Sequence, residues 1–287
     1  MNRQRIFFII FQFLFAVTGV VAQSQSGGAS AYIARGNDWY AKGEWERARA
    51  DYNIALAFNP RSATAYYNRG CALQAIGDLE GAIADYNRAI EINPRYETAY
   101  INRCAIHFSQ GRLDESIADC NRAIEINPRS ACAYSNRGLA KQAKGDLEGA
   151  IADHNQAIAL NPRLETVYYN RGNTYLAKKE LNRALADFDR AVKIQPKFAM
   201  AYCNRGSIRV ALGDFDRAID DYDQAIKLNP QLVIAYQNRG LAKLMQGKEV
   251  EAERDFARCL ALDGKLKPAI EEAISRQKSI LRQESKP

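Results

Sequence analysis

The amino-acid sequence predicts an all-α protein whose helix pairs stack into a solenoid. The first observation is a proline, preceded by Asn or Gln, that recurs every 34 residues, at Pro60, Pro94, Pro128, Pro162, Pro196 and Pro230. The second is that apolar and small residues recur at helical spacing in two stretches of each interval. Helices that cannot bury their apolar stripes alone must stack on their neighbours, so a period of this length predicts a repeat array.

The composition agrees with a folded array. Of the 287 residues, 47% are hydrophobic and 25% are charged, which is enough apolar material for a core and excludes a wholly disordered chain. The 40 Lys and Arg residues outnumber the 33 Asp and Glu residues, and this net charge of +7 permits acidic partners without requiring them. The only two histidines, His107 and His154, exclude a histidine-rich metal centre.

The N-terminal residues have the pattern of a targeting segment. Two arginines precede an almost wholly apolar run over residues 6–22, and the run ends in a small residue, Ala22, as a signal peptidase site requires. We expect residues 1–22 to be a signal peptide cleaved after Ala22 or, alternatively, a membrane anchor through residues 6–22. The chain is therefore predicted to be exported, to the periplasm or the extracellular space, or to be anchored in a membrane. Residues 23–28 are predicted to be a flexible linker.

Alignment on the prolines accounts for the rest of the chain. It gives seven units over residues 29–62, 63–96, 97–130, 131–164, 165–198, 199–232 and 233–266, followed by a C-terminal segment over residues 267–287. These units leave no room for a second domain.

Each unit is predicted to be a helix, a turn and a second helix, as the unit over residues 63–96 shows. Gly77 supplies the turn, and Pro94 ends the second helix because it lacks an N–H and its ring clashes with the preceding turn. Small residues such as Gly70 let the two helices approach closely, and Tyr86 fills the space beside them.

These residues resemble the tetratricopeptide repeat family over about residues 29–266. The family's large residue in the fourth place of the repeat occurs as Tyr32, Tyr66, Tyr100, Tyr134, Tyr168, Tyr202 and Tyr236. Its small residue in the eighth place occurs as Gly36, Gly70, Gly138, Gly172, Gly206 and Gly240, and its alanine in the twentieth as Ala48, Ala82, Ala150, Ala184, Ala218 and Ala252. The resemblance implies a right-handed α-solenoid of seven helix-turn-helix repeats with a C-terminal capping helix.

Departures from the pattern are local. The third unit has Cys104 in place of the glycine and Ser116 in place of the alanine, and the fifth has Lys179 where its siblings carry the turn glycine. The last unit ends at Gly264 without the proline. The capping helix is expected from Lys267 through Leu281, with Ile270, Ala273 and Ile274 on one side.

Two charged places recur in every unit. An arginine in the seventh place is followed sixteen residues later by an aspartate, in the pairs Arg35 and Asp51, Arg69 and Asp85, Arg103 and Asp119, Arg137 and Asp153, Arg171 and Asp187, Arg205 and Asp221, and Arg239 and Asp255. In an antiparallel helix pair the two places lie at about the same height. We therefore predict a ladder of salt bridges, within units or between neighbouring units. The alternative is an arginine row that is open to an acidic ligand.

An asparagine row occupies the sixth place, as Asn68, Asn102, Asn136, Asn170, Asn204 and Asn238, with Ala34 in the first unit. The resemblance implies that this place faces a concave groove. An asparagine amide matches the donors and acceptors of a peptide unit, so the row is predicted to hold the backbone of an extended ligand. The alternative is that the residue was simply inherited with each duplicated unit.

The other predicted groove places are the second, fifth, ninth and twelfth, and they include Tyr67, Phe108, Gln142 and Tyr169. None of these places holds Lys or Arg in any unit, so a clamp for an acidic chaperone C-terminus is not supported. The expected partner is a protein or peptide: a largely uncharged extended segment, or a helix laid in the groove by its apolar stripe.

Cys104 and Cys120 replace a glycine and an aromatic residue on facing helices of one unit. Two interpretations stay open: a disulfide, as an exported protein permits, or two buried thiols that pack as small hydrophobic residues. His107 and His154 take buried aromatic places and are expected to be core residues.

The predicted function is that of a protein–protein interaction scaffold. No nucleophile with its base, metal cluster or phosphate loop stands out from the repeat pattern, so we predict no catalytic residues, no metal site and no cofactor. A membrane-anchored assembly factor or a chaperone-like adaptor using the same repeats is the main alternative. An RNA-binding repeat protein is a remote one, which would show affinity that falls steeply with salt.

Overall fold

The computed structural model describes residues 28–268 and 270–275, and the regular structure of these residues is helical throughout. The predicted targeting segment over residues 1–22 and the residues after 275 lie outside this range. The chain forms two compact units, which divide between Ala140 and Lys141, inside α7 (Ala131–Ala143). We refer to them as unit 1 and unit 2, and to the 34-residue segments as repeats. The predicted all-α class is confirmed.

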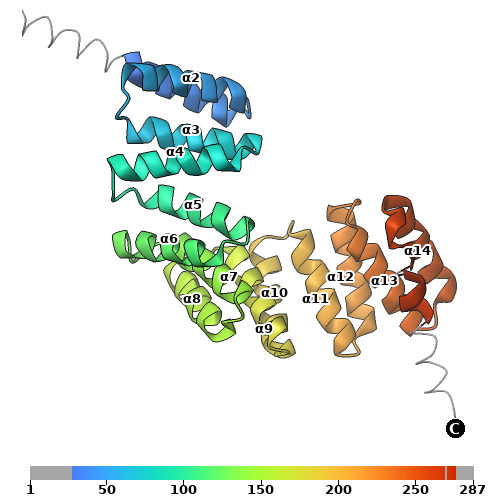
Figure 1. Ribbon diagram of the computed structural model, residues 1–287. Coiled ribbons are helices and arrows are strands. Elements are labelled where there is room, and N and C mark those ends of the chain that lie inside the picture. The colour runs from blue at the N-terminus through green and yellow to red at the C-terminus, as the bar shows by residue number, and fades with distance from the viewer. Residues whose placement is uncertain (1–27, 269, 276–287) are drawn as a thin grey trace, which may run out of the picture. The chain divides into compact units, whose positions relative to one another are not determined.

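Unit 1 is a stack of helices in chain order (Figure 1). A helix over residues 28–41 is followed by α2 (Trp45–Phe58), α3 (Ala63–Ile76), α4 (Leu79–Ile92), α5 (Glu97–Ser109) and α6 (Leu113–Ile126). Consecutive helices from α2 to α6 pack on each other, both within a repeat and between repeats.

Unit 2 repeats the same arrangement. Its helices are α8 (Leu147–Leu160), α9 (Glu165–Ala177), α10 (Leu181–Ile194), α11 (Ala199–Ala211), α12 (Phe215–Leu228), α13 (Val233–Met245) and α14 (Glu249–Leu262). The first helices of the last two repeats, α11 and α13, also contact each other directly.

The turn inside each repeat depends on a left-handed backbone. Gly77 has φ 97° and caps α3, and the glycines at the same place of five other repeats also have positive φ. In the fifth repeat this conformation falls on Lys179, at φ 62°. After the turn, Asp78 accepts a hydrogen bond from Gly81 N (3.0 Å) and so caps α4.

Close packing inside a repeat explains the glycine in its eighth place. A Cβ atom on Gly70 would lie 2.7 Å from the ring of Tyr86, so a larger residue would displace the aromatic side chain. The alanines in the twentieth place, such as Ala82, are completely buried beside the same ring. Small residues therefore set the distance between the two helices, and the aromatic residue fills it.

A short 3-10 turn, η1 (Gly264–Leu266), leads from α14 into the predicted capping helix. Residues 267–268 and 270–275 are helical, while residues 276–281 of the predicted helix lie outside the described range. Ile270 is buried and packs with Tyr236, Phe256 and Cys259 of the last repeat. Ala273 and Ile274 are also partly covered, so the capping helix shields the end of the array with the predicted side.

Candidate functional site

The structure brings the arginine of the seventh place onto the aspartate of the same repeat. Arg69 Nε and Nη2 donate to the two carboxylate oxygens of Asp85, at 2.7 and 2.6 Å. The same two-point pair joins Arg35 to Asp51, Arg103 to Asp119, Arg171 to Asp187, Arg205 to Asp221, and Arg239 to Asp255. Five of these six arginine side chains are well covered, whereas Arg35, in the first repeat, is 55% exposed.

From the second repeat onward, each arginine also reaches the repeat that precedes it. Nη1 of Arg69 donates to Asn53 at 2.7 Å, and Nη1 of Arg103 donates to Asn87 at 2.5 Å. The acceptor always stands in the twenty-fifth place of the repeat, and the remaining pairs are Arg137 with Asn121, Arg171 with Asn155, Arg205 with Asp189, and Arg239 with Asp223. One guanidinium group therefore ties two repeats together.

The tyrosine in the fourth place completes the surroundings of the guanidinium. Arg69 lies 5.4 Å from the ring centroid of Tyr66, and the same contact occurs in all seven repeats. From the second repeat onward, a guanidinium that is bonded to a neighbouring repeat and stacked on a ring is a structural group. This geometry favours the salt-bridge ladder over a row open to an acidic ligand.

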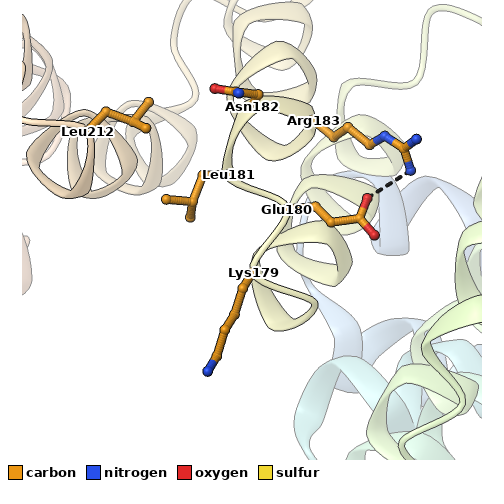
Figure 2. A pocket seen from close by; sticks show the side chains of 6 residues that line it. All are labelled: Lys179, Glu180, Leu181, Asn182, Arg183 and Leu212. Atoms are coloured by element: carbon orange, nitrogen blue, oxygen red, sulfur yellow. Dashed lines mark hydrogen bonds and ion pairs between the residues drawn. The ribbon is translucent and has the colours of Figure 1, made fainter.

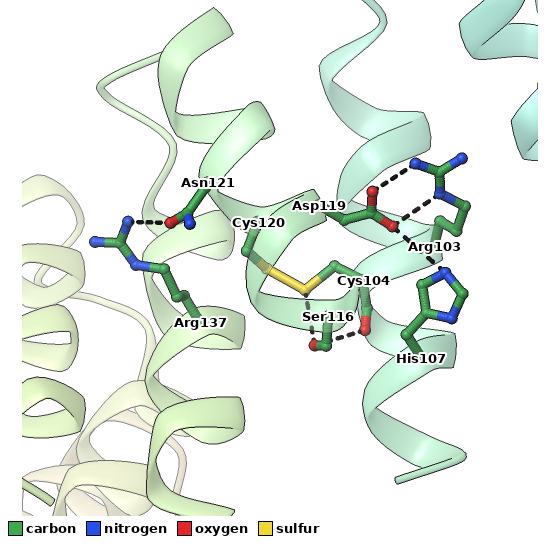
Figure 3. Close-up of a disulfide and its surroundings, with 8 residues drawn as sticks. All are labelled: Arg103, Cys104, His107, Ser116, Asp119, Cys120, Asn121 and Arg137. Atoms are coloured by element: carbon green, nitrogen blue, oxygen red, sulfur yellow. Dashed lines mark hydrogen bonds and ion pairs between the residues drawn. A yellow bond between two sulfur atoms is a disulfide. The ribbon is translucent and has the colours of Figure 1, made fainter. Parts of the chain in front are cut away.

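Arg137 belongs to unit 1 and Asp153 to unit 2. Arg137 donates to Asn121, as Figure 3 shows, and Asp153 lies 2.9 Å from Nζ of Lys141. Lys141 stands in the eleventh place of its repeat. In two other repeats the residue in this place is also a cation that pairs with the aspartate of its own repeat. The other such pairs are Arg209 with Asp221 and Lys243 with Asp255.

The electrostatics of the ladder change along the chain. In the first repeat the hydrogen bond from Arg35 lowers the pKa of Asp51. In the sixth repeat burial raises the pKa of Asp221, against the opposing effect of Arg205 and Arg209. The carboxylate of Asp221 is more deeply desolvated, and it therefore depends more on its two cations.

Most of the asparagine row is bonded to the preceding repeat. Asn68 Nδ2 donates to Asn37 Oδ1 at 2.8 Å, and Asn204 Nδ2 donates to Asn173 Oδ1 at 2.9 Å. Asn102 reaches Cys71 Sγ and Asn238 reaches Ser207 Oγ. These acceptors all occupy the ninth place of the repeat before, so this amide also joins neighbouring repeats.

Asn136 and Asn170 differ from the other four. Both are half-buried, and neither side-chain amide has a hydrogen-bond partner among the described residues. Within unit 1, the ninth place of the repeat before Asn136 is Ala105, which has no side-chain acceptor. The donors and the acceptor of the Asn136 amide remain available to a ligand.

Two of the other predicted groove residues, Tyr67 and Tyr169, lie in matched aromatic clusters. Tyr67 packs against Tyr96, with ring centroids 4.9 Å apart, and its hydroxyl accepts from Asn102 Nδ2 at 3.3 Å. Three repeats later, Tyr169 packs against Phe198 at 4.8 Å, and its hydroxyl accepts from Asn204 Nδ2 at 3.2 Å. Burial raises the pKa of Tyr67 to about 12, so its hydroxyl stays protonated at neutral pH.

Phe108 and Gln142 lie outside these clusters. Phe108 is half-buried near the end of α5. Gln142 accepts a hydrogen bond from Thr174 Oγ1 at 2.8 Å, which fixes its side-chain carbonyl. Four exposed large apolar side chains also stand at predicted groove places: Tyr40, Leu176, Met200 and Ile234.

The cysteines of the third repeat form a disulfide, so the alternative of two separate buried thiols is wrong (Figure 3). Cys104 and Cys120 have Cα atoms 5.8 Å apart on α5 and α6. Ser116, which replaces the small alanine, donates to the carbonyl oxygen of Cys104 at 3.0 Å. The disulfide thus occupies the places of the glycine and the aromatic residue, which are two of the three replaced core positions of this repeat.

The two histidines lie in the core. His154 is completely buried, and neither ring nitrogen has a hydrogen-bond partner. Burial lowers its pKa to about 4, so the ring is neutral at pH 7. His107 is nearly as buried, with Nε2 at 3.7 Å from Asp119, and burial together with Arg112 lowers its pKa.

A shallow hollow of about 540 Å³ lies beside the strained turn of the fifth repeat (Figure 2). Its walls include Lys179, Leu181 and Leu212, and Glu180 and Arg183 pair with each other at 2.8 Å on one side. Sequence reasoning did not single out this hollow, although it did mark Lys179 as a departure.

Within residues 28–268 and 270–275, no group of His, Cys, Asp and Glu side chains is placed to hold a metal ion. No helix in this range has the length and apolar character to cross a membrane, and the apolar run over residues 6–22 lies outside it.

Solved structures similar to this chain are helical repeat proteins. A tetratricopeptide repeat protein from Parabacteroides merdae is 20% identical with a TM-score of 0.66, over 88% of this chain and 99% of that one. PilF of Pseudomonas aeruginosa is 19% identical with a TM-score of 0.65, over 74% and 96%. A chain of the Cut9–Hcn1 complex is 17% identical with a TM-score of 0.73, over 86% of this chain but 48% of that one. At these identities the likeness shows the fold alone.

Comparison with curated protein sequences gives no match. Two family models do match the chain. The tetratricopeptide repeat model matches residues 63–96 and 166–198, and a second TPR repeat model matches residues 36–77, 104–145, 143–179 and 206–247. Together they cover more than half of the 287 residues, and the matches of the first model coincide with two helix pairs, α3 with α4 and α9 with α10. The chain is a member of the tetratricopeptide repeat family.

Proposed function

We propose that this protein binds an extended, largely uncharged polypeptide segment along the first helices of its repeats. Membership of the family makes the chain a scaffold for protein–protein interaction. The proposal adds to this role the surface that binds and the kind of polypeptide segment that it binds. A role in binding rather than catalysis is part of the proposal.

The observation that carries the proposal is that two asparagines of the row have side-chain amides without a hydrogen-bond partner in the part of the chain that the structure describes. Asn102 and Asn204 use their amide N–H groups within the chain, whereas the amides of Asn136 and Asn170 have no partner there. A half-buried amide without a partner is costly unless water or a ligand satisfies it. A peptide backbone offers both the donor and the acceptor that such an amide needs.

The surroundings of the row support an uncharged ligand. Met200 and Ile234 are exposed at the second place of successive repeats in unit 2, and they offer apolar contact to alternate side chains of a bound segment. The arginines one place after the asparagines are engaged with aspartates, so they supply little free charge to a ligand.

The experiment compares two double variants that remove the same number of amides. N136A/N170A removes the free amides, and N102A/N204A removes amides that are bonded within the chain. We expect the first variant to keep its thermal stability and to lose partner polypeptides in affinity capture. The second should lose stability but retain the partners in proportion to its folded fraction. Equal recovery by N136A/N170A and wild type would defeat the proposal.

For localisation we propose an exported protein, with membrane anchoring through residues 6–22 as the alternative. The Cys104–Cys120 disulfide supports this proposal because such bonds persist in oxidising compartments. N-terminal sequencing of the mature protein separates the two forms. A chain that begins at Gln23 is the cleaved form, and a chain that retains residues 1–22 is the anchored one. Recovery of the protein from the cytosol would contradict both.

A further inference from the structure

A row of basic residues occupies the corners between the repeats of unit 1. The corner row consists of Arg61, Arg95 and Arg129, each directly after the proline of its repeat. All three side chains are exposed, and none has a carboxylate partner among the described residues. Other exposed arginines of this unit, such as Arg88 and Arg122, pair with glutamates one helical turn away at 2.6 and 2.7 Å.

The backbone holds the three corners in the same conformation. The backbone N–H of Arg61 donates to Oδ1 of Asn59, two residues earlier, at 3.1 Å. The N–H groups of Arg95 and Arg129 donate in the same way to the asparagine two residues before each of them, at 3.1 and 3.0 Å. Because second helices run back along first helices, the corners all lie at one edge of the stack. Figure 1 shows this for the α2–α3 and α4–α5 connections. The charges therefore recur along that edge at the spacing of the repeats.

Folding alone does not favour these charges. Each arginine stands one residue before the N-cap of a first helix, where the positive end of the helix dipole opposes a cation. At the opposite edge, two of the three second helices of unit 1 have an acidic N-cap residue, Glu44 or Asp78, as the helix dipole favours, and the third has Arg112. The repeated cations at the unfavourable ends indicate an external anionic partner.

We propose that the corner row docks unit 1 onto an anionic phospholipid surface. Single charges repeated along an edge suit the phosphates of a flat surface, which requires no pocket and no ligand sequence. In the membrane-anchored form of the protein, position along the chain favours the same partner. The apolar run over residues 6–22 is separated from the first helix of unit 1 by a few residues, which span at most about 20 Å. A membrane that holds that run lies within reach of unit 1.

The test uses the only two tryptophans of the chain, Trp39 and Trp45, which both lie in the first repeat. Energy transfer from them to a dansyl lipid is measured with the full chain on vesicles of phosphatidylcholine and on vesicles that also contain phosphatidylglycerol. The difference between the two vesicles reports docking through charge, whether or not residues 6–22 are inserted. We expect more transfer on the anionic vesicles at low salt, and the excess should disappear in high salt.

Two triple variants with the same change in net charge decide the role of the row. R61Q/R95Q/R129Q removes the corner row, and R49Q/R88Q/R122Q removes three exposed arginines of the second helices. Each basic residue near such a surface contributes about fivefold, so the first variant should lose about a hundredfold in apparent lipid affinity. The second should keep most of the affinity. Both should melt close to wild type.

Three results would overturn the proposal: equal loss in both variants, which indicates net charge alone; equal transfer on neutral and anionic vesicles; or an unchanged excess in R61Q/R95Q/R129Q. Binding of an RNA oligonucleotide that depends on the corner row, with lipid transfer unaffected, would assign the row to nucleic acid instead.

Discussion

Arg69 and Asp85 form a two-point ion pair across the second repeat, with both oxygen contacts at 2.7 Å or less. The aspartate side chain is 7% exposed and the arginine 24%, so the pair is largely removed from water. The remaining Nη1 donates to Asn53 of the first repeat. The pair therefore serves both the closure of one repeat and its attachment to the repeat before it.

Removal of either partner of this pair should destabilise the protein more than a surface pair would. D85A leaves the Arg69 guanidinium without its carboxylate, at a cost of about 3 kcal/mol in the free energy of unfolding. A double-mutant cycle with R69A should show at least about 1 kcal/mol of coupling, measured by urea denaturation. The control cycle is the exposed pair of Arg88 and Glu91, for which much weaker coupling is expected because water screens both charges. Equal coupling in the two cycles would show that burial adds nothing to the ladder.

His154 should make the protein sensitive to acid. Its pKa is about 4 in the folded chain, against an ordinary value of 6.5, because burial disfavours the charged ring. Below pH 6.5, His154 binds a proton in the unfolded chain, whereas in the folded chain it stays neutral until the pH approaches 4. Stability is therefore complete above that pH and falls as the pH decreases towards 4.

The variant H154F tests this directly, since Phe188 and Phe256 occupy the same place in other repeats. The loss of unfolding free energy between pH 6.5 and 4 should be smaller in H154F by about 3 kcal/mol. Denaturant unfolding at several pH values gives the difference. Parallel pH profiles for H154F and wild type would rule out the effect.

The disulfide should substitute for the packing that the third repeat lacks. Closure of a loop of this length contributes about 3 kcal/mol, so a reductant should lower the melting temperature of the wild type. The matched variant C104G/S116A/C120Y restores the glycine, alanine and tyrosine found at these places in the second repeat. It should melt near the oxidised wild type and should not respond to reductant. A wild type that melts identically with and without reductant would contradict this role.

Lys179 should cost stability, because a residue with a side chain is disfavoured in the left-handed region. K179G should raise the free energy of unfolding by about 1 kcal/mol. The reverse change at the equivalent turn of the next repeat, G213K, should lower it by a similar amount, because Gly213 has φ 79°. Thermal melting of both variants measures the two changes in stability, which should have opposite signs. A K179G variant that is less stable than wild type would show that the lysine makes a compensating contact.

Features that recur with one residue type could be predicted from the sequence. The tyrosine, arginine, glycine and aspartate places repeat at fixed intervals, and so the helix pairs and the residues that meet across each pair followed from the period. The contacts between repeats could not be predicted in this way. Their acceptors vary, as Asn37, Cys71 and Ser207 do in the ninth place, and so show no recurring residue type.

The disulfide and the free amides could not be predicted from the sequence, because both depend on distances between atoms. Two cysteines on facing helices are compatible with either thiols or a bond, and only the separation of their Cα atoms distinguishes the two. Likewise, the six asparagines look equivalent in sequence. Asn136 differs from Asn102 because the preceding repeat offers Ala105 in place of Cys71.

The most direct test of the proposed binding mode is site-specific photo-cross-linking from Met200 and Ile234. These residues occupy the same place on α11 and α13, which contact each other. Packed helices lie about 10 Å apart, which corresponds to about three residues of an extended chain or about seven of a helix. A cross-linker at Val250, on α14 of the last repeat and 65% exposed, is the control. We predict that the first two positions capture one partner segment at sites about three residues apart, and that position 250 does not capture it. Capture from position 250 alone, or sites scattered over unrelated segments, would contradict the proposed groove.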